Sequence, residues 1–253
     1  MPYQGGLSLI LDYLLLPSYL LFKDSGRPRS SPGEQDLFAY PWDKSSLKSM
    51  PIDLQQLEKL DAYARKVSAR SSVESLVSVL LQEAHSDLEK VRAIWMWICH
   101  HIEYDGTSAS YEPADVLQSG KTVCAGYARL FEKMCSIAGI GCKYLAGYAK
   151  GYSFKEGKDV KDKRHAWNAV YIDGRWHLLD CTWASGFVKD GKFTFSYDEF
   201  YFLTHPAVFI NDHFPEDSKW QLLKPTLSEQ EFGRNKRLSM LFFYRSLLLH
   251  LQE

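Results

Sequence analysis

The sequence lacks the patterns by which several common classes of site are recognised. Its five cysteines form no C-x-x-C pair and no zinc-ligand spacing, and it has neither a glycine-rich phosphate loop nor an EF-hand loop. Lysine and arginine (30) nearly balance aspartate and glutamate (31), so the net charge of −1 gives no footprint for nucleic acid. We therefore expect no metal, no cofactor and no nucleic-acid partner.

Long apolar runs are also scarce. Residues 7–22 are rich in leucine, but this run is too short for a comfortable membrane span and is interrupted by Asp12 and Pro17. No basic segment precedes it and no clear cleavage site follows it, which weakens a signal-peptide interpretation. We favour an extension that packs loosely or associates, followed by a Ser/Pro/Gly-rich linker at 24–36, over a targeting or membrane role.

What is present is an ordinary globular composition, with 45% hydrophobic and 24% charged residues in a chain of 253. That length allows one large or two small domains. The cysteines other than Cys124 are expected to be reduced, mostly buried thiols of a cytosolic protein. They are Cys99, Cys135, Cys142 and Cys181.

Three helices are predicted before the central motif. Asp53 precedes an apolar stripe from Leu54 to Val67, and residues 71–74 form a capping box that opens a second helix. A third helix is predicted at 88–104, with His100 and His101 as its polar end.

Residues 121–131 are typical of a short turn that leads directly into a helix. Thr122 is the predicted N-cap, which places Cys124 in the first helical turn. A thiol there lies at the positive end of the helix dipole, which favours the thiolate. The alternative is that Cys124 is a small buried hydrophobe, as free cysteines usually are.

Residues 164–183 are predicted to form a β-hairpin around Asp173 and Gly174. A two-residue loop sets Ile172 opposite Arg175. Continued outward, this register pairs Trp167 with Asp180 and His165 with Thr182, and it puts His177 and Cys181 on the other face.

His165 and Asp180 then become diagonal neighbours on one face of the hairpin. A histidine held by an aspartate on rigid strands is the orienting half of a catalytic triad. The alternative is a surface hairpin with an incidental His–Asp pair. The combination with Cys124 favours a Cys-His-Asp site.

These motifs resemble one known family. The runs 121–128, 165–170 and 176–183 follow the signature order of the transglutaminase-like superfamily. Further runs resemble a branch of muscle cysteine peptidases; they are 40–49, 91–95, 99–105, 200–206, 213–217 and 220–223. The resemblance implies an α+β, papain-like fold, in which N-terminal helices and a nucleophile helix pack on an antiparallel sheet. It also implies Cys124 as nucleophile, His165 as base and Asp180 as orienter.

The resemblance divides the chain into an extension and linker at 1–37, a transglutaminase-like domain at 38–227, and an atypical tail at 228–253. Family members carry further β-rich domains after this point, so the tail is interpreted as a truncated or alternative terminus in preference to a docked terminal helix. A further departure is Ala125, where the family often has an acidic or amide residue.

The activity that the resemblance implies is that of a peptidase acting on cytoskeletal muscle proteins, in the cytoplasm at the Z-line. A protein-crosslinking transglutaminase, a non-catalytic scaffold and an inert fragment remain alternatives. Trp167 and Trp183 favour crosslinking if they line a tunnel, whereas the charged loop 151–164 is expected to be a wet substrate rim. The second oxyanion donor stays open between Trp97 and Gln118.

Overall fold

The computed structural model describes residues 47–68, 71–151 and 163–234. The predicted extension at 1–37, most of the charged loop 151–164 and most of the tail 228–253 lie outside these residues. The helices are α2 (Leu54–Lys66), α3 (Val73–Leu80), α4 (Asp87–His101), α5 (Pro113–Ser119), α6 (Cys124–Ile137), α7 (Cys181–Ser185), α8 (Pro206–Phe209) and α9 (Glu229–Arg234). The strands are β1 (Glu103–Tyr104), β2 (Lys121–Thr122), β3 (Gly141–Ala149), β4 (Arg164–Ile172), β5 (Arg175–Leu179), β6 (Gly186–Lys189), β7 (Lys192–Phe195) and β8 (His213–Pro215).

The predicted helices exist, but two of their ends differ from expectation. Asp53 caps α2 as predicted, whereas the capping box of α3 joins Ser72 and Ser75 and not the residues at 71 and 74. Helix α4 ends at His101, because the next residues form β1, which pairs with β2 through Tyr104 and Thr122.

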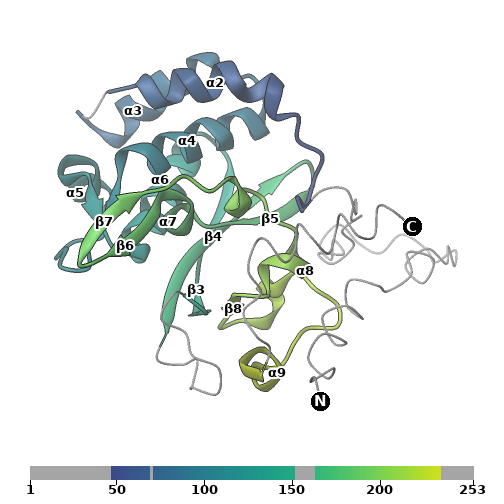
Figure 1. The fold of residues 1–253 in the computed structure, drawn as a ribbon. Helices are drawn as coiled ribbons and strands as arrows, with labels where there is room; N and C mark the ends of the chain where they lie inside the picture. Colours follow the sequence, from purple (N-terminus) through teal and green to yellow (C-terminus); the bar gives the residue numbers. More distant parts are fainter. Residues whose placement is uncertain (1–46, 69–70, 152–162, 235–253) are drawn as a thin grey trace, which may run out of the picture.

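Helix α4 lies at the centre of the protein. It is buried at nearly every position from Val91 to Cys99, and helices α2 and α6 pack against it. Figure 1 shows α2, α3 and α4 as a helical layer that covers α6 and the sheet. A helix that is apolar around most of its surface must be enclosed on all sides. Helix α4 is enclosed by α2, α6 and α7.

The main sheet has the order β5-β4-β3-β8 and is antiparallel throughout. Its β4–β5 hairpin has the predicted register, with Ile172 opposite Arg175, and Asp173 and Gly174 both take positive φ in the turn. Helix α6 packs on β3 and β4, so the predicted α+β arrangement of a nucleophile helix on an antiparallel sheet is confirmed.

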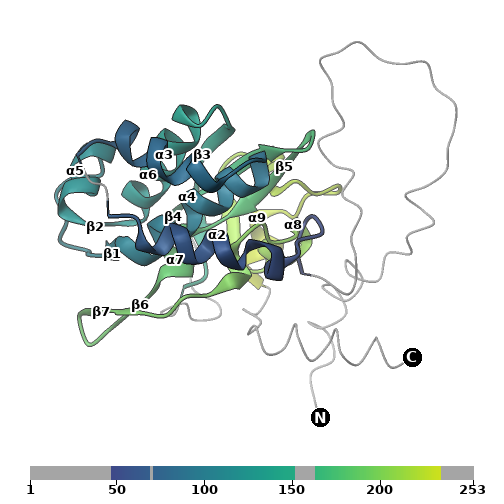
Figure 2. The same cartoon turned by 90° about the horizontal axis from the view of Figure 1, so that it is seen from above.

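The remaining elements surround this sheet. Strands β6 and β7 form a separate hairpin that projects from the body of the protein (Figure 2). Helix α9 packs back on the sheet edge through Phe232, which is buried against Phe214. Within the described ranges, no helix has the length and apolar character needed to cross a membrane.

Candidate active site

Cys124 is the first residue of α6, as predicted, but the predicted cap is wrong. Val123 occupies the N-cap position and makes no side-chain capping bond. Thr122 is instead held extended by its pairing in β2, where its hydroxyl donates to the carbonyl of Ser110. Gly126 makes this approach possible, because a Cβ atom there would collide with the Thr122 side chain. The amides at the start of α6 therefore have no side-chain cap beside the thiol.

The thiol of Cys124 is partly exposed and lies against β4. It makes a hydrogen bond with the side chain of His165, and the backbone N–H of Ala166 donates to it. Burial opposes ionisation of the thiol, but the bond to His165 and the charge of that ring outweigh it and lower the pKa of Cys124. The arrangement favours a thiolate paired with an imidazolium.

His165 joins the thiol to a buried carboxylate. Its Nε2 lies 2.7 Å from Oδ2 of Asp180, which leaves Nδ1 for the side of Cys124. Burial disfavours a charged ring, yet the charge and hydrogen bond of Asp180, followed by the contact with Cys124, raise the pKa of His165 to about 10. The structure thus brings all three predicted residues together.

Asp180 reaches this position by a route that differs from the predicted one. The β4–β5 ladder ends at Asn168 and Leu179, so the predicted pairings of Trp167 with Asp180 and of His165 with Thr182 do not form. The chain turns into α7 immediately after Asp180, because this residue is the N-cap of that helix. The carboxylate is therefore fixed by a helix start as well as by a strand end.

The two oxygens of Asp180 divide their contacts. Oδ1 accepts from the backbone amides of Thr182 at 2.8 Å and Trp183 at 3.2 Å, while Oδ2 accepts from the histidines. Burial would raise the pKa of this carboxyl, but the charge and hydrogen bond of His165 hold it well below its usual range, and His213 adds to the effect. Asp180 stays ionised while it orients His165.

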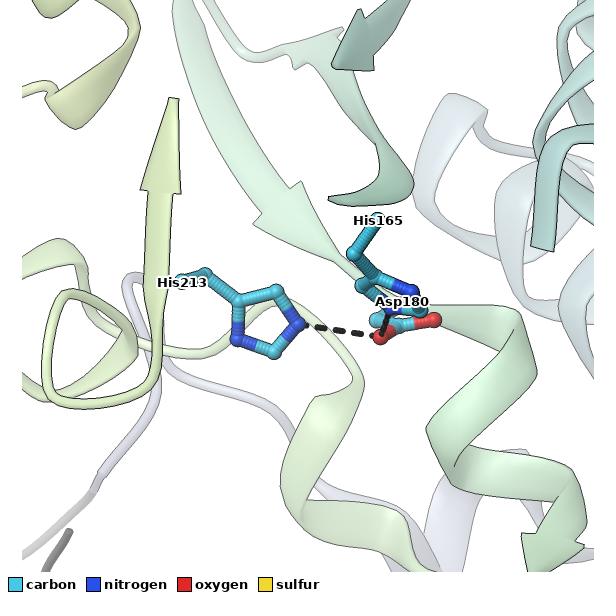
Figure 3. Close-up of side chains that lie close together, drawn as sticks. All are labelled: His165, Asp180 and His213. Atoms are coloured by element: carbon cyan, nitrogen blue, oxygen red, sulfur yellow. Dashed lines mark hydrogen bonds and ion pairs between the residues drawn. The ribbon is translucent and has the colours of Figure 1, made fainter. Parts of the chain in front are cut away.

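His213 is a site residue that sequence reasoning missed. Its Nε2 lies 3.0 Å from the same Oδ2 of Asp180, and its Nδ1 lies 2.6 Å from Oδ1 of Asp212. Figure 3 shows its ring and that of His165 approaching one carboxylate from different elements. The run 213–217 supported the resemblance, but only the pairing of β3 with β8 brings His213 to the site, and a register between distant strands is not readable from one sequence.

The same three side chains also meet the geometric description of a metal-binding cluster. The ligand atoms of His165, Asp180 and His213 lie within 4.8 Å of one another. Their mutual hydrogen bonds of 2.7 and 3.0 Å already account for this arrangement, and an ion would have to displace the hydrogens between them. We therefore describe the cluster as a hydrogen-bonded one.

The two candidate oxyanion donors have different outcomes. Trp97 is wrong, because its indole is fully buried and its single N–H donates to the carbonyl of Val67 at 2.9 Å. Gln118 is exposed near the end of α5, one short strand before α6, and its assignment stays a prediction.

Aromatic side chains border the site. Trp183 is partly exposed with its ring 5.0 Å from that of His165, whereas Trp167 is buried, 1% exposed, behind it. Tyr104 and Tyr144 are half-buried, and burial followed by the nearby charge of Cys124 raises the pKa of both. The two tyrosines belong to β1 and β3, so they were not predictable as neighbours of the thiol.

Comparison with known proteins places this site in a family. The transglutaminase-like superfamily matches residues 74–181, a range that contains Cys124, His165 and Asp180. The chain therefore belongs to the transglutaminase-like superfamily, and the predicted resemblance is confirmed.

Within that class, the chain is similar to kyphoscoliosis peptidase of Homo sapiens, with 55% identity over 231 residues, or 88% of this chain and 35% of that protein. Hillarin of Drosophila melanogaster is 29% identical over 79% of this chain and 26% of its own. A solved structure described as a TGase has a TM-score of 0.34 and 20% identity over 62% of this chain and 40% of its own. The chain spans about a third or less of the length of the curated relatives named here.

Proposed function

We propose that this protein is a cysteine-dependent acyl-transfer enzyme that hydrolyses amide bonds in protein substrates. The observation that carries the proposal is the continuous contact from Cys124 through His165 to Asp180. The name of the relative with 55% identity, a peptidase, supports it. Each residue has one role: Cys124 is the nucleophile, His165 the general base and acid, and Asp180 the residue that orients the ring.

In the first step the Cys124 thiolate attacks the carbonyl carbon of an amide, and a C–S bond forms. The oxyanion accepts hydrogen bonds, of which the amide of Cys124 offers one. The C–N bond then breaks as the His165 imidazolium gives its proton to the leaving amine. In the second step His165 takes a proton from water, and the hydroxide attacks the thioester. The thiolate is released with a carboxylic acid, which loses its proton to the solvent. Proton transfer of this kind contributes roughly 10²–10⁴-fold to the rate.

Crosslinking would use the same thioester with a lysine amine in place of water. That outcome requires an apolar path that excludes water. Burial of Trp167 removes one of the two predicted walls, which leaves Trp183 beside His165 and favours hydrolysis. For the substrate we propose cytoskeletal proteins of muscle, with the enzyme in the cytoplasm at the Z-line, as the family resemblance implies.

The test compares the thiols of the protein with one another. Iodoacetamide should alkylate Cys124 faster than the other four cysteines near pH 7, because the rate follows the thiolate fraction. His165→Ala should slow labelling of Cys124 by about 10²-fold. Peptide mapping by mass spectrometry measures each site, and His177→Ala is the matched control, because His177 is a buried histidine on the other side of the hairpin.

The products then separate the classes of activity. The protein is incubated with a glutamine-containing muscle protein and a dansylated amine, with and without EDTA. Peptide cleavage or ammonia release that survives EDTA and is lost in Cys124→Ser supports the hydrolase. Dominant amine incorporation would show that the activity is crosslinking and not hydrolysis. In the alkylation experiment, equal labelling of all five cysteines would refute an activated nucleophile and favour a scaffold.

A further inference from the structure

His213 and Asp212 continue the site beyond the predicted triad. His213 is buried, 1% exposed, and each of its ring nitrogens lies within 3.0 Å of a carboxylate oxygen. Donation to both carboxylates requires a hydrogen on each ring nitrogen. Asp212 Oδ1 at 2.6 Å fixes the ring so that the Nε2–H is aimed at Asp180.

Aromatic rings hold His213 in this orientation. The ring of Phe209 stacks on it at 4.0 Å with an interplanar angle of 24°, and that of Trp183 lies 4.4 Å away. The ring of Trp167 meets it edge-on at 5.1 Å. A histidine in such an apolar enclosure would destabilise the fold if its ring nitrogens had no hydrogen-bond partners. Its contacts with Asp180 and Asp212 therefore allow His213 to be buried there.

From this geometry we infer that His213, oriented by Asp212, is a positioning residue that fixes Asp180 as the acceptor for His165. The inference rests on the proposed function. Oδ2 of Asp180 accepts from both histidines, and its Oδ1 is already occupied by the start of α7. Without the bond from His213 the carboxylate loses one of the contacts that set its orientation toward His165, and the imidazolium–thiolate pair weakens.

Two substitutions distinguish positioning from packing. His213→Gln keeps an N–H donor but places a polar amide in the aromatic enclosure. His213→Phe keeps an aromatic ring but has no donor. A positioning role predicts that Gln retains more of the Cys124 reactivity than Phe, whereas a packing role predicts the reverse order.

The readout is the alkylation rate of Cys124 at pH 6 with iodoacetate and with iodoacetamide. The anionic reagent is favoured while His165 is protonated beside the thiolate, so the ratio of the two rates reports the ion pair. We expect His213→Phe to lower the iodoacetate rate by roughly tenfold, the change that one pKa unit produces. We also expect it to lower the ratio, and His213→Gln to restore much of both.

The controls address folding and site specificity. His213→Phe removes the histidine partner of the buried Asp212, so the double variant with Asp212→Asn is measured beside it. A thermal melt confirms that each variant is folded. His177→Phe and His177→Gln are matched controls, because His177 is 2% exposed and bonds to Ser49 and to the carbonyl of Ile172. They should leave the reactivity of Cys124 unchanged.

Three results would overturn the inference: equal rates in the wild type and both His213 variants, a Phe variant faster than the Gln variant, or the same losses in the His177 controls. A wild-type Cys124 no more reactive than the other thiols would instead refute the proposed function. The two failures are therefore distinguishable in one experiment.

Discussion

Two buried polar clusters in this protein are built from similar parts and differ in what they can do. The first is the site cluster of His165, Asp180, His213 and Asp212. The second is centred on Arg92 of α4, which is 2% exposed and makes bonds of 2.7–2.8 Å to Asp61 and Glu199.

The members of the Arg92 cluster form hydrogen bonds with one another. Arg92 contributes a guanidinium that does not titrate near neutral pH, Tyr197 donates to Glu199 at 2.6 Å, and Trp95 donates to the Tyr197 hydroxyl at 3.1 Å. The site cluster instead uses imidazoles, and it ends at the partly exposed thiol of Cys124. A reactive cluster therefore differs from a structural one in two ways. Its groups can exchange a proton, and one of its ends is open to substrate.

The largest expected effect that sharpens this comparison is on stability. Arg92→Met leaves the buried Asp61 without its guanidinium partner, leaves Glu199 with Lys48 and Tyr197 alone, and should cost about 3–5 kcal/mol of folding free energy. That corresponds to a fall of roughly 10 °C in Tm, measured by calorimetry. Below the lowered Tm, the alkylation rate of Cys124 should be unchanged, because Arg92 does not belong to the site cluster.

The matched control is Arg129→Met. Arg129 pairs with Glu112 at 3.2 Å on the surface, where both side chains are exposed, and its loss should cost less than about 1 kcal/mol. Equal losses in the two variants would mean that the Arg92 cluster is no more structural than a surface pair. A slower Cys124 in Arg92→Met would mean that the two clusters are coupled.

The next largest expected effect is on the pH dependence of folding stability. The raised pKa of His165 gives stability that is complete below pH 6.5 and is lost as the pH rises to about 10. The lowered pKa of Cys124 has the opposite sign: its contribution is complete above its ordinary value of 9.0 and is lost as the pH falls. The two slopes oppose each other below pH 9, and above pH 9 only the His165 slope remains, so stability falls from pH 9 to about 10.

Cys124→Ala removes the opposing slope, so this variant should lose stability relative to the wild type as the pH rises toward 9. One unmatched proton changes the unfolding free energy by about 1.4 kcal/mol per pH unit. Lys48 pairs with Glu199 of the Arg92 cluster at 3.7 Å, and burial lowers its pKa to about 8. It gives an opposing slope that is common to both proteins and cancels in their difference. Parallel Tm–pH curves from pH 7 to 10 would contradict an ion pair at the site.

The sequence was sufficient to predict the site's central residues because their signals are local. A β-turn fixes the register of the β4–β5 hairpin, and the start of α6 fixes the place of Cys124. The errors arose where distant segments compete with local preference. Thr122 is a good N-cap in isolation, but pairing between β1 and β2 holds it in a strand.

The same reason explains why other residues of the site were not predicted. His213 reaches Asp180 only through the pairing of β8 with β3, and Asp212 is linked to the site through His213. The indole N–H of Trp97 is already used by a bond to Val67 at the end of α2. Hydrophobic periodicity predicts which face of an element is buried. It does not predict which partner a buried polar atom finds.

The smallest expected effects come from a matched pair of tyrosines, one in the Arg92 cluster and one beside the site cluster. The Tyr197 hydroxyl links Trp95 to Glu199 by bonds of 3.1 and 2.6 Å, so Tyr197→Phe leaves a buried indole N–H without this acceptor and should cost about 1–3 kcal/mol. The Tyr201 hydroxyl donates to Oδ2 of Asp212 at 3.4 Å, a long bond whose loss in Tyr201→Phe should cost no more than about 1 kcal/mol.

Chemical denaturation measures the stability of both variants, and Cys124 alkylation is followed in parallel. Tyr197→Phe should change stability and leave the alkylation rate alone. In Tyr201→Phe, a loss of Cys124 reactivity larger than its loss of stability would extend the site cluster to Tyr201, whereas an unchanged rate would place the limit of the cluster at Asp212.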